Sequence, residues 1–170
     1  MKLSFMTKLV FASTLAASAE LASAALINVE LFNFNAPNNV ATNQAYIANN
    51  SPNQRFQLTS LPSISGNGSA NPISIFGPAV VAGSIETITT VDLAFTNTLY
   101  RFTGFLDLGV TDQVFKIVAN DGFLLSIAGT TILTSNTQGT QTKTTSIAAG
   151  PQAFELIYWN NATAGSLNFT

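Results

Sequence analysis

Cysteine and histidine are both missing from this chain of 170 residues, and charged side chains make up only 8% of it. Without cysteine no disulfide can form, so stability must come from a core and from backbone pairing. The lack of both residue types excludes Ser-His and Cys-His nucleophilic catalysis and the usual zinc sites. Six Lys and Arg against eight Asp and Glu provide no basic cluster for phosphate contacts. No nucleic-acid partner is therefore expected.

The N-terminus has the pattern of an export signal. A lysine-containing start is followed by an apolar run over residues 9–19 and by the small-x-small segment Ala22-Ser23-Ala24. The run is shorter than the roughly 20 apolar residues of a membrane span. A retained N-terminal anchor is the alternative, but the small residues directly after the run favour cleavage. We predict a signal peptide over 1–24 and a single domain without a membrane span over 25–170. The expected location is secreted, at the cell surface or in the periplasm.

The part after the signal reads as β almost throughout. Ile27, Val29 and Leu31 alternate with their neighbours at the period of a strand. Many short apolar segments separated by Gly, Asn and Pro indicate an antiparallel β-sandwich or barrel, lectin-like in type. One helical turn is expected around residues 45–48. The expected strands cover residues 27–32, 56–59, 73–76, 85–95, 99–108, 113–119, 123–128, 130–134, 142–148, 152–159 and 165–170.

Carboxylates are the remaining candidates for catalysis, since glycoside hydrolysis uses a pair of them. Glu155 alternates with the core-like Phe154 and Leu156 and is expected to face solvent, and Asp107 and Asp112 flank a turn. Turn or surface roles are favoured for all candidates except Asp121, and we expect no enzyme. The candidates are Glu30, Glu86, Asp92, Asp107, Asp112, Asp121 and Glu155.

One segment, Asn120-Asp121-Gly122, gathers oxygen ligands between two apolar strands, and Asn160-Asn161 ends a later strand. An acid with amide side chains at strand tips is a plausible calcium and sugar site. The alternative is an ordinary hairpin turn, because all three residue types favour turns. Trp159 could stack on a sugar ring or pack at the end of the sandwich, and packing is slightly favoured.

The order of segments in the second half extends this interpretation. Arg101-Phe102-Thr103-Gly104-Phe105 is followed by an apolar strand, by residues 120–129, by an Ala-Gly turn and by residues 154–158. Over residues 97–170 this order resembles the anthrax protective antigen-type domain, a β-sandwich found in adhesins, toxins, glycosidases and exported bacterial proteins. The chain departs from the usual pattern at Asn120, where an acid is common. It departs again at Ser126 and Ala128, which replace an aromatic residue and an acid.

The resemblance implies a calcium ion that binds sugar hydroxyls directly. Because Asn120 replaces an acid, one negative charge is missing, and weak calcium binding or none is expected. In the family the two acids are joined by a cis peptide, so the resemblance raises the question of whether the 120–121 peptide is cis or trans. The implied metal ligands are Asn120, Asp121, Asn160 and the carbonyls of Ala162 and Ala164. The sugar-binding residues that we predict are Asn120, Asp121 and Asn160, together with Trp159 and Asn161, which stand beside Asn160 in the sequence.

Together these observations predict a non-catalytic carbohydrate- or surface-binding module. Its expected partner is a glycan or a cell-surface polysaccharide, and calcium is the one cofactor to test. The alternative is a structural protein of an envelope or extracellular matrix that self-associates, or an accessory subunit of a secreted complex.

Overall fold

The computed structural model describes residues 26–90, 93–109, 112–161 and 164–170. The predicted signal peptide over 1–24 lies outside these ranges. The helical elements are the α-helix α1 (Val40–Asn49) and the 3₁₀ helix η1 (Ser74–Ala79). The strands are β1 (Ile27–Asn33), β2 (Gln54–Leu58), β3 (Ser63–Asn67), β4 (Glu86–Thr87), β5 (Thr98–Leu108), β6 (Asp112–Ala119), β7 (Phe123–Ile127), β8 (Thr130–Ser135), β9 (Gly139–Ser146), β10 (Gly150–Asn160) and β11 (Ala164–Phe169).

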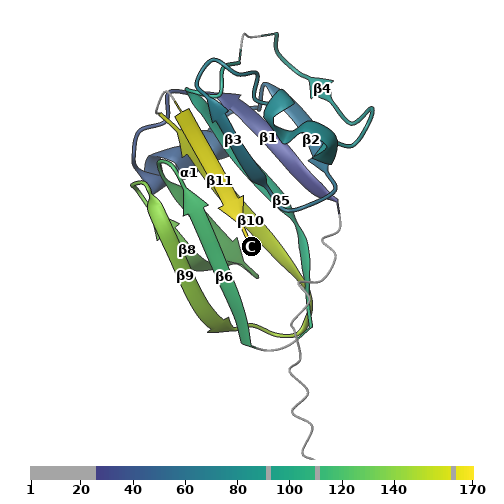
Figure 1. Ribbon diagram of the computed structural model, residues 1–170, viewed down its shortest axis with the longest axis vertical. Coiled ribbons are helices and arrows are strands. Elements are labelled where there is room, and N and C mark those ends of the chain that lie inside the picture. Colours follow the sequence, from purple (N-terminus) through teal and green to yellow (C-terminus); the bar gives the residue numbers. More distant parts are fainter. Residues whose placement is uncertain (1–25, 91–92, 110–111, 162–163) are drawn as a thin grey trace, which may run out of the picture.

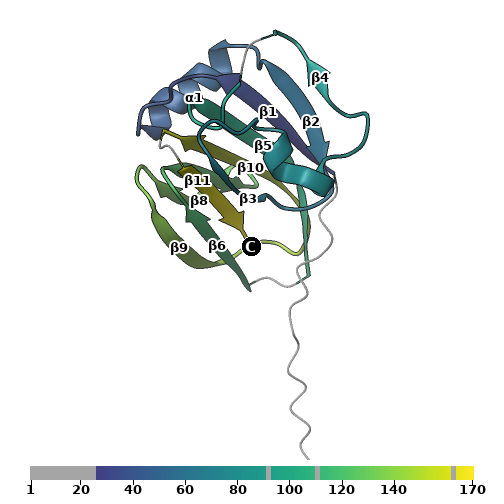
Figure 2. The same cartoon turned by 45° about the horizontal axis from the view of Figure 1, so that its top comes forward.

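Two antiparallel sheets pack against each other, which confirms the predicted β-sandwich (Figures 1 and 2). The large sheet has the strand order β4-β2-β1-β5-β10-β7-β8, and the small sheet has the order β3-β11-β6-β9. β5 and β10 pair over their full length in the middle of the large sheet. In the described ranges no helix is long and apolar enough to cross a membrane.

The core lies between the sheets and follows the alternation of the strands. In β6, Phe115, Ile117 and Ala119 are buried while the residues between them are more exposed. Phe154 of the large sheet meets Phe169 of the small sheet with ring centroids 6.0 Å apart. Each such side chain contributes about 1.5–3 kcal/mol when it leaves water. The core thus provides the stability that a chain without disulfides requires.

A second apolar cluster lies on the outer face of the large sheet, beneath α1. Phe32, Ile157 and Trp159 are buried there against partly buried side chains of α1 that include Tyr46. The helix begins after Asn39, whose Oδ1 accepts a hydrogen bond of 3.0 Å from the Thr42 N–H. A ten-residue helix therefore stands where the sequence predicted a single turn.

Two of the expected strands are wrong. Residues 73–76, expected to be extended, begin η1, which inserts Phe76 into the core beside Phe56 at 5.3 Å between centroids. Gly77 has a φ of 52° and Pro78 follows it, so the segment bends sharply instead of extending. The expected strand over 85–95 is reduced to the two residues of β4. Residues 91–92 lie outside the described ranges.

The strand directions define two ends of the sandwich. β6 and β10 end and β11 begins at the upper end in Figure 1. β1 begins and β11 ends on the side away from this end, but short of the opposite end, which β5, β6 and β10 reach. The upper end carries the described residues that the sequence singled out for binding.

Candidate ligand-binding site

The segment Asn120-Asp121-Gly122 forms the turn between β6 and β7. Asp121 has a φ of 73°, a left-handed conformation that Asp tolerates better than most residues, and the 120–121 peptide is trans. The Asn120 N–H donates to the Ser166 carbonyl at 2.8 Å, and the Trp159 N–H donates to the Gly122 carbonyl at 3.3 Å. The turn is therefore tied to both β10 and β11.

Gly122 is required by the close approach of Trp159. A Cβ on this glycine would lie 2.0 Å from Trp159 Cζ2 and 2.7 Å from the Ser135 carbonyl oxygen. The Trp159 side chain is fully buried, and its Nε1–H donates to Asn38 Oδ1 at 3.0 Å. This burial fits the packing alternative for Trp159, because no face of the indole is open to a sugar ring.

The structure brings Asp121 and Asn161 together. The Asn161 N–H donates to Asp121 Oδ2 at 2.7 Å, and Asn161 Nδ2 lies 3.3 Å from Asn38 Oδ1. Asn161 Oδ1 is buried and has no hydrogen-bond partner in the structure. A buried acceptor without a donor costs about 1–3 kcal/mol. This oxygen is thus suited to a cation or to a donor from a ligand.

Asn160 takes a different direction from Asn161. Its side chain is fully buried, and Nδ2 donates to the Phe95 carbonyl at 3.4 Å. Gly165 leaves the space for it, because a Cβ there would lie 2.5 Å from Asn160 Nδ2. Asn160 therefore points into the end of the sandwich, away from the contact between Asp121 and Asn161.

Two of the expected metal ligands are bonded to each other. Asn120 Nδ2 donates to the Ala164 carbonyl at 2.6 Å, so an amide nitrogen occupies the position facing that oxygen. Ala162, a further expected ligand, lies outside the described residues. In the described ranges no group of three or more His, Cys, Asp or Glu could hold a metal. An ion at this turn would share the Asp121 carboxylate with the Asn161 N–H, and it could also be held by Asn161 Oδ1 and, if Asn120 released it, by the Ala164 carbonyl.

The buried phenol of Tyr158 belongs to the same end of the sandwich. Burial raises its pKa well above the ordinary value, and the negative charge of Asp121 raises it further. Tyr158 is therefore neutral over the whole physiological range.

Asn38 is the contact residue that sequence reasoning missed. It stands 121 residues before Trp159 in the chain and reaches the site because α1 folds over the outer face of the large sheet. The signal available in the sequence was the run Pro37-Asn38-Asn39, which is typical of a helix start, since Asn is a favoured cap.

The two sheets, their strand order and the polar turns at one end define the fold of the protective antigen-type domain, known as PA14. A PA14 sugar-binding domain from an RTX adhesin superposes with a TM-score of 0.66 at 24% identity, covering 87% of this chain and 89% of that one. The PA14 domain of an antifreeze protein gives 0.66 at 21% identity, with 91% and 86% covered. No protein-family model and no curated protein matches the sequence.

A more distant similarity extends to fungal proteins. The A domain of epithelial adhesin 9 from Candida glabrata, solved in complex with Galb1-3GlcNAc, gives a TM-score of 0.60 at 11% identity, with 89% of this chain and 85% of that chain covered. At these identities the similarity establishes the fold. The ligand must be argued from the residues of this chain.

Proposed function

We propose that this protein is an exported, non-catalytic carbohydrate-binding module whose site is formed by Asn38, Asn120, Asp121 and Asn161. The observation that carries the proposal concerns Asn161. Its Oδ1 is buried and has no hydrogen-bond partner, and its backbone N–H donates to the Asp121 carboxylate. The similarity to the sugar-binding PA14 domain of the RTX adhesin and to the Candida adhesin domain in complex with a disaccharide supports it.

Amide-rich sites suit sugars because each amide offers one acceptor and two donors to neighbouring hydroxyls. Asn38 is exposed, and Asn120, Asp121 and Asn161 are half-buried, so a ligand can reach these side chains, while the buried Asn161 Oδ1 becomes accessible when its side chain turns outward. The backbone hydrogen bond from Asn161 orients the Asp121 carboxylate in advance. Such preorganisation reduces the ordering cost of binding.

Calcium assistance is part of the proposal. Asp121 and Asn161 would hold the ion, which would supply a positive charge for sugar hydroxyls. The Ala164 carbonyl could join them only by losing its hydrogen bond to Asn120, at a net cost of about 1 kcal/mol. The family-derived set of Asn120, Asp121, Asn160, Ala162 and Ala164 would also require Asn160 to leave the Phe95 carbonyl. Calcium binding should therefore be weak.

We infer export from the predicted signal peptide over residues 1–24, and this inference can be tested directly. Full-length protein expressed in a bacterial host should reach the periplasm or the medium with Ala25 at its N-terminus, as read by mass spectrometry. Protein that keeps residues 1–24 in the cytoplasm would contradict export without affecting the sugar site.

The variant Asp121→Ala tests the site. Wild-type protein should bind members of a glycan array in calcium-containing buffer, and Asp121→Ala should lose about tenfold in affinity or more. The control is Asn168→Ala, an exposed residue of β11 outside the cluster. Unchanged binding by Asp121→Ala, with an unchanged melting temperature, would rule out this cluster as the sugar site.

Self-association is the second candidate function, and the edge strand β9 favours it. β9 pairs with β6 in unbroken register from Asp112–Ser146 to Ala119–Gly139, and it forms one edge of the small sheet. Regular edges can pair with another chain. Light scattering over a wide concentration range tests this function, and a constant monomer mass would contradict it.

A further inference from the structure

The outer face of the large sheet carries a row of ion pairs beside α1. Glu30 of β1 bonds to Arg55 of β2 and to Arg101 of β5, each at 3.1 Å, and Arg101 bonds to Glu155 of β10 at 2.7 Å. These four side chains cross four adjacent strands in the order β2-β1-β5-β10. Glu155, expected from the sequence to face solvent, lies on this face as half of a pair.

The middle of the row is only partly exposed, whereas Arg55 at its end is 48% exposed. The exposed fraction is 35% for the Arg101 side chain and 20% for the Glu30 side chain. Burial disfavours the charged form of Arg101, but its hydrogen bonds to Glu155 and Glu30 and their charges outweigh this and raise its pKa. The Arg101 guanidinium therefore stays charged, and its planar donor groups are held between the carboxylates of Glu30 and Glu155.

A shallow groove follows this row. It consists of two depressions of about 590 Å³ and 430 Å³ that share Asn28, Arg101 and Thr103. One end of the groove reaches Ser84 and Glu86, and the other reaches Gly129 and Thr131, while Gln44 of α1 lines it from the side. From β2 to β8 the groove spans five strand spacings, or about 24 Å.

Phe105 gives the groove an apolar surface. Its side chain is 54% exposed, the highest value among the large apolar residues of the described ranges that carry an aromatic ring. Gly104 precedes it, and the exposed Ala153 lies opposite it on β10, so the ring has no bulky neighbour on the β10 side. An exposed aromatic ring beside planar polar groups matches the two kinds of surface of a sugar ring, its C–H face and its hydroxyl edge.

We propose that this groove is a second binding site, for an extended neutral oligosaccharide that lies across the strands. The groove holds two arginines and three glutamates, with Glu86 at one end, so its lining carries one net negative charge and disfavours an anionic ligand. Arg101, Glu155, Asn28 and Thr103 present fixed donors and acceptors to hydroxyls, and Phe105 receives the apolar face of one ring. The site shares no residue with the cluster at Asp121.

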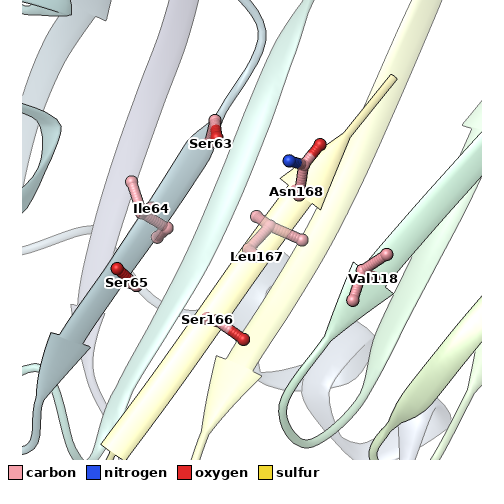
Figure 3. A pocket seen from close by; sticks show the side chains of 7 residues that line it. All are labelled: Ser63, Ile64, Ser65, Val118, Ser166, Leu167 and Asn168. Carbon is pink, nitrogen blue, oxygen red and sulfur yellow. The ribbon is translucent and has the colours of Figure 1, made fainter.

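The small sheet provides a contrasting surface. A depression on its outer face is lined by Ser63, Ser65, Val118, Ser166 and Asn168 with Ile64 and Leu167 (Figure 3). It has hydroxyls and an amide but neither a charged group nor an aromatic ring. Asn168→Ala is therefore a matched control on the opposite face of the same sandwich.

The experiment is a titration of the full mature chain with cellohexaose, mannohexaose and galactohexaose, followed by NMR and calorimetry. The variants are Phe105→Ala and Thr103→Val, with Asn168→Ala as control. Phe105 is exposed and Thr103→Val keeps the side-chain volume, so both variants should fold. At least one hexaose should shift the Arg101 Nε–H and Phe105 signals, and each variant should weaken its binding about tenfold.

The outcomes separate the two sites. Binding that is lost in Phe105→Ala and kept in Asp121→Ala supports the groove. Binding that is lost in Asp121→Ala and unaffected by Phe105→Ala and Thr103→Val overturns the groove and leaves the first site intact. No signal shift at Arg101 or Phe105 with any of the three hexaoses also overturns it, as does preferential binding of polygalacturonate, an anionic probe.

Discussion

At the scale of single residues, the upper end of the sandwich contains two glycines whose surroundings leave no room for a Cβ atom. Gly122 and Gly165 are glycines because Trp159 and Asn160 lie against their backbones, at distances where a Cβ would collide. Neither contact involves a left-handed glycine. The turn and the buried side chains beneath it are thus a single packed unit.

Gly122→Ala should destabilise the protein by about 3 kcal/mol, the upper range for forcing extra atoms into a packed site. The added methyl would meet the Trp159 ring and the Ser135 carbonyl, and only the ring could shift. Chemical denaturation followed by Trp159 fluorescence measures the change. Gly139→Ala is the control, because nothing lies within 4 Å of its Cβ position. Equal stability of the two variants would contradict the packing described for Gly122.

Asn120→Asp should create a calcium response. The carboxylate cannot donate to the Ala164 carbonyl, so without calcium the variant should lose about 1–3 kcal/mol. The added negative charge beside Asp121 should then allow calcium to raise the melting temperature. Differential scanning calorimetry with calcium and with chelator measures both effects. A melting temperature that is the same in the two buffers would show that charge is not what limits the site.

At the scale of elements, most strands were predictable, because apolar segments bounded by Gly, Asn and Pro mark them whether one face or both are buried. β6, buried on one face, and β10, buried on both faces near its end, were each expected within two residues of their observed bounds. The sequence predicted a strand where η1 begins, because a short apolar run such as Ile73 to Phe76 fits a strand or a helix equally well. β3 was not predicted, because it lies in a stretch rich in Gly, Ser and Asn. It forms a strand because it pairs with β11.

The candidate site was predictable to a similar extent. The positions of both segments at strand tips and the resemblance to the protective antigen-type domain predicted that the β6–β7 turn lies near the end of β10, and the structure puts Asp121 in contact with Asn161. The opposite directions of the Asn160 and Asn161 side chains follow the alternation of side chains along a strand. Asn38 and the groove depend on α1 and on strand register, and neither was apparent from local patterns.

The helix α1 covers Trp159, so its N-cap should control the exposure of that residue. Asn39→Ala removes the acceptor for the Thr42 N–H and should weaken the helix by about 1 kcal/mol. Hydrogen exchange of the α1 amides should accelerate, and acrylamide should quench Trp159 more strongly. Asn49→Ala, at the other end of the helix, is the control. Unchanged quenching would indicate that the cluster beneath α1 holds without the cap.

At the scale of the whole molecule, two buried tyrosines govern the response to alkali. Burial raises the pKa of Tyr100 and of Tyr158 far above the ordinary value of about 10. Below about pH 10 both phenols are neutral in the folded and in the unfolded chain, so their contribution to the free energy of unfolding is fully present. Above it the unfolded chain releases protons that the folded chain retains. Stability should therefore fall as the pH rises beyond about 10.

Tyr158→Phe should reduce this alkaline sensitivity. The variant has one group fewer to ionise on unfolding, so its loss of stability above about pH 10 should be smaller than that of wild type. Urea denaturation at a series of alkaline pH values measures the slope. Tyr46→Phe, a half-buried tyrosine on α1, is the control. Equal slopes for Tyr158→Phe and wild type would contradict this assignment.

The positions of Ile27 and Phe169, on the side of each sheet away from the Asn120–Asp121 turn, have a mechanical consequence. A force that separates these two residues acts on strands of different sheets and pulls both from the ends that face away from this turn. Such a load opens backbone hydrogen bonds one after another, as in a zipper, and does not shear a whole strand at once. The domain should yield at low force in an optical trap, beginning where β1 and β11 leave their neighbours, while the upper end stays folded longest.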